Sequence, residues 1–295
     1  MHLEGTGKCR FARRKRNETT VMIEFQNVSK RFPDGTLAVE DFSLVLPSHK
    51  ATVLVGSSGS GKTTLLRMIN RMVDPTDGKV LIDGEDISSL NPVMLRRRIG
   101  YVLQAIGLLP HRRVVDNIAS VPRLNGVPKR VARRDALTLL DTVGLDRSLA
   151  DRYPDQLSGG QQQRVGVARA LASDPDILLM DEPFGAVDPI VRAELQVELN
   201  RLQRELGKTT VFVTHDIDEA FTIADQVVIL RTGGVIAQVG TPAEILANPA
   251  DDFVATFIGA DKGKRALYLQ HREGDSATLI VDGDGRPAGI LGADR

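Results

Sequence analysis

A glycine-rich loop between an apolar run and a run with helical spacing carries the first candidate chemistry of this chain. It fits the spacing G-x-x-x-x-G-K-[ST], follows the apolar residues 52–55 and leads into 64–69. Glycines allow several backbone N–H groups and a helix N-terminus to point at one phosphate. This strand–loop–helix context predicts a nucleoside triphosphate site, in which Lys62 reaches the β- and γ-phosphates and the Thr63 hydroxyl binds Mg²⁺. The residues expected to hold the nucleotide here are Gly56, Ser57, Ser58, Gly59, Ser60, Gly61, Lys62, Thr63 and Thr64.

A second run of small residues, LSGGQ at positions 157–161, precedes a helical run that extends to residue 172. A helix start with free N–H groups favours anions, so the chain carries a second candidate phosphate-binding element. An ordinary serine–glycine helix cap would explain this segment taken alone. Beside the first loop, however, the pentapeptide makes the chain resemble the ATP-binding-cassette (ABC) ATPases. The resemblance implies that Ser158, Gly159, Gly160 and Gln161 of one subunit close on the γ-phosphate held by a second copy, so that a working site needs a dimer.

Two adjacent carboxylates follow a third informative segment. Residues 177–180 form a continuous apolar run, which is typical of a buried parallel strand, and the run ends in Asp181 and Glu182. A lone Asp-Glu pair at a strand end would be two solvated acids. Within the resemblance, Asp181 matches the carboxylate that supports Mg²⁺, and Glu182 matches the residue that polarises the attacking water.

Four further residues match the family in the expected order along the chain. Gln104 ends the strand-like run 99–103 and matches the glutamine that senses Mg²⁺ and water. His215 follows the strand-like run 210–214 and matches the histidine that contacts the γ-phosphate. Asp188 matches the loop that crosses to the partner subunit. Phe32 holds the position where the family stacks an aromatic ring on adenine, although a core role beside the first strand remains an alternative.

The chemistry that the resemblance implies is phosphoryl transfer from ATP to water. Its transition state spreads negative charge over the γ-phosphoryl oxygens, so catalysis is mainly positioning and electrostatic stabilisation. Lys62, His215, Mg²⁺ and the second copy's signature residues would supply the positive field, while Glu182 would deprotonate water. Hydrolysis should therefore be slow until two copies close on each other.

Composition limits the classes of function. The 295 residues are 42% apolar, which is enough for a large core, and the formal net charge is zero, so no global basic field indicates nucleic acid as a partner. No apolar run approaches the roughly 18 residues of a membrane-spanning helix. We therefore expect any membrane link to go through another protein. Cys9 is the only cysteine, and no apolar stretch follows the basic start, which favours a cytoplasmic chain without a signal peptide.

The order of the runs predicts an α/β fold, and the resemblance implies a P-loop NTPase cassette. We expect a mostly parallel core sheet flanked by helices, an N-terminal antiparallel β subdomain and an inserted helical subdomain at about 105–165. Its clearest helix should span 129–143, with Val131, Leu137, Leu140 and Val143 on one face and a stop at Gly144. The expected cassette covers 22–262. Residues 1–21 form a basic, disordered extension, and the tail 263–295 resembles one hairpin of a cystathionine-β-synthase-type repeat.

Three segments narrow the resemblance to importers of osmoprotectants, namely 98–111, 181–189 and 214–220. It implies import of quaternary amines such as glycine betaine, choline and carnitine. It also implies transmembrane permease subunits, a second copy of the chain and an extracytoplasmic solute-binding protein as partners, with the chain peripheral at the cytoplasmic face of the membrane. Ala105 and Leu109 depart from relatives, which often carry Gln and Phe. An importer of another solute, such as an amino acid, is the alternative; the single cassette disfavours a role on DNA or ribosomes.

Overall fold

A six-stranded, mostly parallel sheet forms the centre of the computed structural model, which describes residues 22–104, 107–185 and 187–259 and the backbone of 268–270, 279–281 and 287–290. Its strand order is β10-β9-β3-β8-β7-β6, and only the edge strand β10 is antiparallel to its neighbour. The strands are β3 (Ala51–Gly56), β6 (Ile99–Val102), β7 (Ile177–Asp181), β8 (Thr209–Thr214), β9 (Gln226–Leu230) and β10 (Ile236–Gly240). Parallel neighbours place the carboxyl ends of β3, β6, β7 and β8 at one edge, where ligands bind in such sheets.

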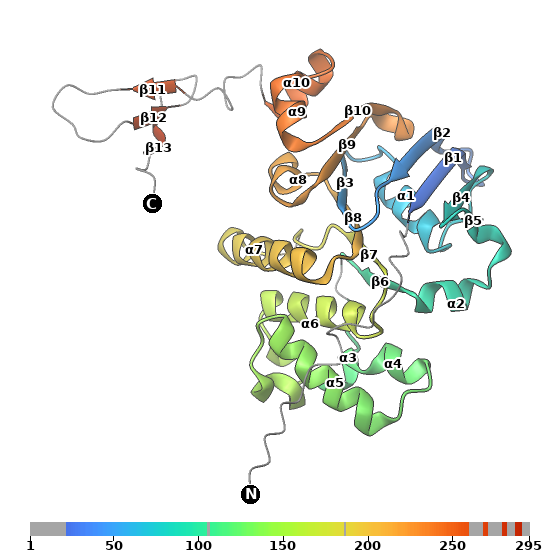
Figure 1. Cartoon of the computed structure of the whole chain (residues 1–295), viewed down its shortest axis with the longest axis vertical. Helices are drawn as coiled ribbons and strands as arrows, with labels where there is room; N and C mark the ends of the chain where they lie inside the picture. Colours follow the sequence, from blue (N-terminus) through green and yellow to red (C-terminus); the bar gives the residue numbers. More distant parts are fainter. Residues whose placement is uncertain are drawn as a thin grey trace, which may run out of the picture.

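Both faces of this sheet are covered by helices (Figure 1). Val53 and Val55 of β3 belong to a core that includes helix α8 (Ile217–Ile223), whereas Leu54 belongs to a second core that includes α1 (Lys62–Ile69). Every residue of β3, β7 and β8 is buried, as the apolar runs predicted. The other flanking helices are α2 (Pro92–Arg97), α7 (Pro189–Leu206), α9 (Pro242–Ala247) and α10 (Asp252–Ile258), with short 3₁₀ turns at Ile87–Ser89 and Thr232–Gly234.

An antiparallel sheet of order β2-β1-β4-β5 packs on α1. Its strands are β1 (Ile23–Arg31), β2 (Leu37–Leu46), β4 (Asp77–Ile82) and β5 (Glu85–Asp86). The rings of Phe25 and Phe42 meet edge to face in its core, with centroids 5.2 Å apart. The sheet confirms the predicted N-terminal β subdomain.

The inserted helical subdomain lies at one end of the molecule, beyond β6 and α7 (Figure 1). It contains α3 (Val114–Ile118), α4 (Ser120–Leu124), α5 (Lys129–Thr142) and α6 (Gly159–Leu171), with 3₁₀ turns at Arg147–Asp151 and Pro154–Gln156. Helix α5 ends as expected: the N–H of Gly144 donates to the carbonyl of Asp141, and that of Leu145 to Leu140, at 3.0 and 2.9 Å.

The face that we predicted for α5 is partly wrong. Its buried residues are Ala132, Ala136, Leu139 and Leu140, whereas Val131 and Leu137 are only half-buried. The two alanines occupy this stripe because their small side chains allow close packing against neighbouring helices, which a search for large apolar residues overlooks.

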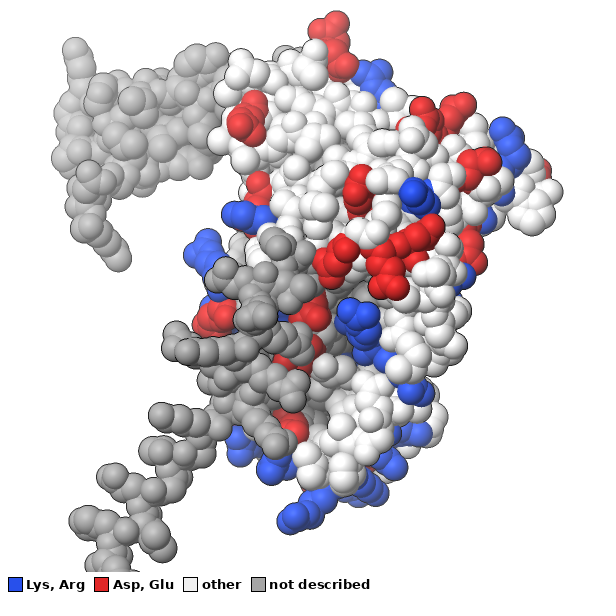
Figure 2. Space-filling model, turned by 45° about the vertical axis from the view of Figure 1, so that its right-hand side comes forward, with Lys and Arg blue, Asp and Glu red and all other residues white. Residues whose placement is uncertain are grey.

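Charge on the surface is uneven despite the net charge of zero. In the view of Figure 2, basic side chains gather at the lower end, where the helical subdomain lies, and acidic ones gather above it. Within the described residues, no helix combines the length and hydrophobicity needed to cross a membrane.

The tail contributes three short antiparallel strands in the order β11-β12-β13. They are β11 (Tyr268–Gln270), β12 (Leu279–Val281) and β13 (Pro287–Ile290), so the predicted hairpin is confirmed and one strand was missed. Its interpretation as a repeat remnant and the boundary near 262 remain predictions. The expectations for residues 1–21 lie outside the described residues.

Candidate functional site

The glycine-rich loop joins β3 to α1 and curls around the ammonium group of Lys62. The Lys62 Nζ donates to the carbonyl oxygens of Gly56 and Ser57, both at 2.8 Å, and to Ser60 Oγ at 3.1 Å. Gly61 caps α1 with φ 81°, and a Cβ there would lie 2.6 Å from the Ala38 carbonyl oxygen. Glycine is therefore required at this position for both its backbone angle and the close approach of β2.

Two opposing effects act on the pKa of Lys62. Burial lowers the pKa of the ammonium group, and the nearby carboxylates of Glu182 and Asp181 act in the opposite direction. Two carbonyls and a hydroxyl hold the ammonium group inside the loop, close to the two carboxylates.

Asp181, the last residue of β7, forms the centre of a second set of contacts. Its Oδ1 accepts a 2.9 Å hydrogen bond from the Thr63 hydroxyl, and its Oδ2 accepts one from the Tyr101 hydroxyl at 3.3 Å. Arg67, one helical turn after Thr63, places its Nη2 3.6 Å from the same Oδ2. The Thr63 hydroxyl and the Asp181 carboxylate are the hard oxygen donors that Mg²⁺ prefers when phosphates complete its shell. These residues fit the ion that the sequence predicted.

Glu182 lies between residues from two neighbouring strand ends. Its Oε2 accepts a hydrogen bond from Gln104 Nε2 at 3.1 Å, and its Oε1 lies 3.3 Å from His215 Nδ1. Its backbone has φ 44°, an uncommon value for a residue with a side chain, and its N–H donates to the Val213 carbonyl at 2.9 Å. The left-handed backbone turns the chain sharply after β7, at the point where the Glu182 carboxylate contacts Gln104, which follows β6, and His215, which follows β8.

A pocket of about 400 Å³ opens over these groups. It is lined by Ser58, Gly59, Gly61, Lys62, Thr63, Thr64, Glu182 and His215. The structure thus brings the glycine-rich loop, the second carboxylate and the histidine together around one cavity. Gln104 and Asp181 contact its lining residues.

The signature residues do not line this pocket. Ser158 caps α6: its Oγ accepts from the Gln161 N–H at 3.3 Å, and the Gln161 side chain accepts from the Ser158 N–H at 3.0 Å. Gly160 is buried against α7, whereas a Cβ on Gly159 would meet nothing within 4 Å. The expected contact of these residues with a phosphate held by a second copy remains a prediction.

Asp188 and Phe32 also lie outside the pocket lining. The Asp188 carboxylate caps α7 by accepting 3.1 Å hydrogen bonds from the N–H groups of Ile190 and Val191. Phe32 is half-buried in the turn after β1, with the Lys30 ammonium 5.5 Å from its ring centroid. The expected contacts of Asp188 with a partner and of Phe32 with adenine remain predictions.

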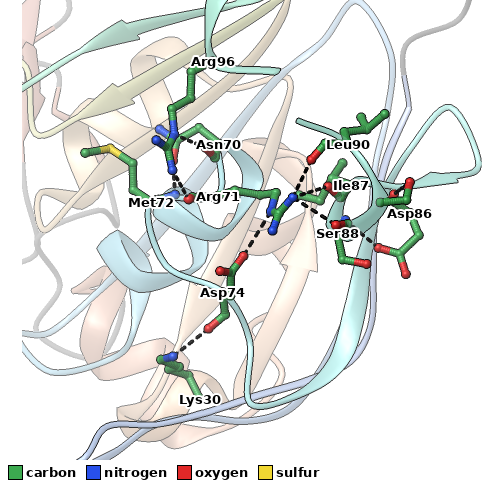
Figure 3. Close-up of polar contacts among 11 residues, drawn as sticks. Lys30, Asn70, Arg71, Met72, Asp74, Asp86, Ile87, Ser88, Leu90 and Arg96 are labelled. Carbon is green, nitrogen blue, oxygen red and sulfur yellow. Dashed lines mark hydrogen bonds and ion pairs between the residues drawn. The ribbon is translucent and has the colours of Figure 1, made fainter. Parts of the chain in front are cut away.

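Sequence reasoning missed the residues that hold α1 and α2 together (Figure 3). The Arg71 guanidinium donates from Nη1 to three carbonyl oxygens before α2, those of Ile87, Ser88 and Leu90, at 3.1, 3.0 and 2.7 Å. In return, Arg96 of α2 donates from Nε to the Asn70 carbonyl at 3.0 Å and from Nη2 to the Arg71 carbonyl. Because α2 leads into β6, this exchange fixes the strand that precedes Gln104 relative to α1.

One of the contacts that sequence reasoning missed, that of Arg67 with Asp181, has a local signal. Thr63 and Arg67 are four residues apart and so share one helix face, which places Arg67 near the carboxylate that Thr63 contacts. Arg71, by contrast, binds carbonyl groups 16 to 19 residues away, which no local pattern reveals.

Known proteins are similar to this chain over most of its length. The domain family described as "ABC transporter" matches residues 39–185. The choline transport ATP-binding protein OpuBA of Bacillus subtilis is 51% identical over 241 residues, which are 82% of this chain and 63% of that protein. The glycine betaine uptake system ATP-binding protein YehX of Escherichia coli is 50% identical over 250 residues, 84% of this chain and 80% of YehX. The chain thus spans less than two thirds of some relatives and most of another.

Solved structures share the fold. A dimeric post-hydrolysis state of the ATP-binding cassette MJ0796 bound to ADP and Pi is 33% identical, with a TM-score of 0.68 over 75% of this chain and 98% of that one. The cbiO1 protein of Clostridium perfringens, part of the ABC transporter complex cbiONQ, is 29% identical, with a TM-score of 0.71 over 78% of this chain and 92% of that one. The cassette architecture expected from the sequence is confirmed.

Proposed function

Because this chain belongs to the ABC transporter family of ATP-binding proteins, we propose that it hydrolyses ATP to energise a membrane importer of quaternary amines. The observation that carries the hydrolytic part is the placement of Glu182. Its carboxylate lies between Gln104 and His215 at a pocket that the Lys62 loop also lines.

Each group around the pocket has a chemical task in this reaction. Lys62 and the loop N–H groups bind the β- and γ-phosphates, and His215 contacts the γ-phosphoryl oxygens. Mg²⁺, held by Thr63, Asp181 and Gln104, would neutralise charge on the phosphates. Glu182 orients a water molecule in line with the γ-phosphorus and accepts its proton. Phe32 stacks on the adenine ring.

A second copy completes the site. Ser158, Gly159, Gly160 and Gln161 begin a helix whose N–H groups suit a γ-phosphate, yet none of them lines the pocket of its own chain. The partner's signature therefore closes on this pocket, with Asp188 at the crossing. The dimeric form of the similar cassette MJ0796 supports this arrangement.

The names of the relatives support the substrate class. OpuBA is named for choline, YehX for glycine betaine, and OpuCA of Listeria monocytogenes, 49% identical over 241 residues, for carnitine. The chain then acts at the cytoplasmic face of the membrane, bound to transmembrane permease subunits that receive solute from an extracytoplasmic binding protein. An importer of a different small solute, such as an amino acid, is the alternative.

Uptake by cells lacking this chain tests the proposal. Such cells should lose ATP-driven uptake of labelled glycine betaine, choline or carnitine at high external osmolarity, and re-expression should restore it. A His215→Ala form, expressed to the same level, should not restore uptake. Normal uptake of all three solutes in the deletion strain would refute the substrate class, and a simultaneous loss of amino-acid uptake would favour the alternative.

A further inference from the structure

The residues on both sides of His215 are held by one buried side chain, Glu219 of α8. Its Oε2 accepts a 2.5 Å hydrogen bond from the Thr214 hydroxyl, whose oxygen in turn accepts from the Asp216 N–H at 3.0 Å. Glu219 is only 6% exposed, whereas the His215 side chain is 63% exposed. The imidazole therefore has few packing contacts of its own, and its backbone position depends on this buried support.

Arg192 connects that support to a different part of the chain. Its Nη1 lies 3.6 Å from Glu219 Oε1 and 3.8 Å from Asp216 Oδ2, and its Nη2 donates to the Val187 carbonyl at 3.4 Å. Arg192 belongs to the first turn of α7, the helix that Asp188 caps. One guanidinium thus contacts both the segment before α7 and the groups around His215.

These contacts are weaker than those of an ordinary structural ion pair. The Arg192–carboxylate distances exceed the 2.7–2.9 Å or so of a strong charge-assisted hydrogen bond. Arg192 Nε is buried without a hydrogen-bond partner among the described residues, and burial raises the pKa of Glu219. A pair kept for stability alone would gain little from this geometry, because desolvation opposes the attraction.

We propose that Arg192 and Glu219 are positioning residues that set the His215 imidazole against Glu182 and link it to the segment 187–188. The inference rests on the proposed ATP hydrolysis and adds a connection within one subunit. A displacement of Val187 moves the guanidinium, which moves Glu219 and with it Thr214 and Asp216. The 3.3 Å separation between His215 and Glu182 then changes. The placement of segment 187–188 would in this way be transmitted to the γ-phosphate contact.

Steady-state ATP hydrolysis by the purified full-length chain tests this link. Arg192→Ala and Glu219→Ala should each lower kcat about 10- to 100-fold while KM for ATP stays within about twofold, since misplacement costs rate and not binding. Glu219→Gln keeps an acceptor for Thr214 and should lose less than Glu219→Ala. The matched control is Arg201→Ala, which removes shorter ion pairs to Glu198 and Glu205 from the same helix and should leave kcat unchanged.

A double mutant separates positioning from a general structural effect. Because Arg192 acts through His215, adding Arg192→Ala to His215→Ala should lower kcat no further, whereas independent effects would multiply. Wild-type kcat in both single mutants, Arg192→Ala and Glu219→Ala, would overturn this inference while leaving ATP hydrolysis intact, and so would fully multiplicative losses in the Arg192→Ala/His215→Ala double mutant. Absence of hydrolysis by the wild-type dimer would overturn the proposed function, and this inference with it.

Discussion

Gly160→Ala should destabilise the folded chain, although an adjacent Gly159→Ala should not. A Cβ at residue 160 would lie 2.4 Å from Val191 Cγ1, whereas carbon atoms in contact need about 3.5 Å or more. Helix α6 and α7 must therefore separate by about 1 Å, or Val191 must leave its rotamer, which is strongly preferred for a β-branched residue in a helix. Neither glycine has a positive φ, so backbone conformation does not distinguish them.

The expected cost follows from overpacking. Inserting a methyl group into a tight contact costs typically about 1–3 kcal/mol. At about 2–4 °C per kcal/mol for a chain of this size, Gly160→Ala should lower the melting temperature by roughly 2–12 °C. Gly159→Ala meets no atom within 4 Å and should leave the melting temperature unchanged or slightly raised.

Thermal unfolding of four proteins would decide the matter: wild type, Gly160→Ala, Val191→Ala and the double mutant. Removing the Val191 methyl groups makes room for the new Cβ, so the double mutant should be more stable than the sum of the two single losses predicts. Equal melting temperatures for the Gly159 and Gly160 variants, or strictly additive losses in the double mutant, would refute the packing argument. The second signature glycine would then be required only for its N–H group.

The remaining predictions concern the pocket and its supports. Glu182→Gln should bind ATP yet hydrolyse it slowly and accumulate as an ATP-bound dimer, whereas Lys62→Ala should lose affinity in a nucleotide titration; wild-type turnover of Glu182→Gln would remove Glu182 from its role. Burial raises the pKa of Glu219 above its usual 4.5, so the folded chain holds more protons than the unfolded chain between the two pKa values. The contribution of Glu219 to the free energy of unfolding therefore falls as the pH rises from the unfolded-state pKa to the folded-state pKa. The melting temperature of Glu219→Gln should accordingly rise relative to that of the wild type from pH 4.5 upward, and a difference in melting temperature that does not change with pH would contradict this. Arg71→Ala should cost about 2 kcal/mol in denaturant titrations through lost charged hydrogen bonds, whereas replacing the exposed Arg98, which directly follows α2, with alanine should cost almost nothing.

The pocket could be predicted from the sequence because its residues follow apolar runs. Runs ending at Gly56, Gln104, Asp181 and His215 were expected to be parallel strands, and parallel strands end at a common edge. The contacts that position the residues at this edge could not be predicted. The contact of Glu219 with Thr214 and the left-handed backbone of Glu182 both depend on tertiary packing, and neither has a signature in local spacing.

Buried alanines and long side chains account for the other differences between the sequence-based predictions and the structure. The buried stripe of α5 runs through Ala132 and Ala136, which carry little hydrophobic signal, so the prediction placed the larger Val131 and Leu137 in the stripe beside the correctly predicted Leu140. The long, flexible side chain of Arg71 reaches from the end of α1 to the segment before α2. Its partners there are backbone carbonyl groups, which any sequence would offer.

The backbone angle of Glu182 has a consequence for engineering this protein. A residue with a side chain at φ 44° costs roughly 1–2 kcal/mol relative to glycine, and the surrounding fold supplies that energy. Glycine or asparagine at position 182 would relieve the strain, so a screen for thermostability alone would favour the substitutions that remove the proposed water-activating carboxylate. Selection for heat resistance in this chain therefore has to be paired at every round with selection for turnover.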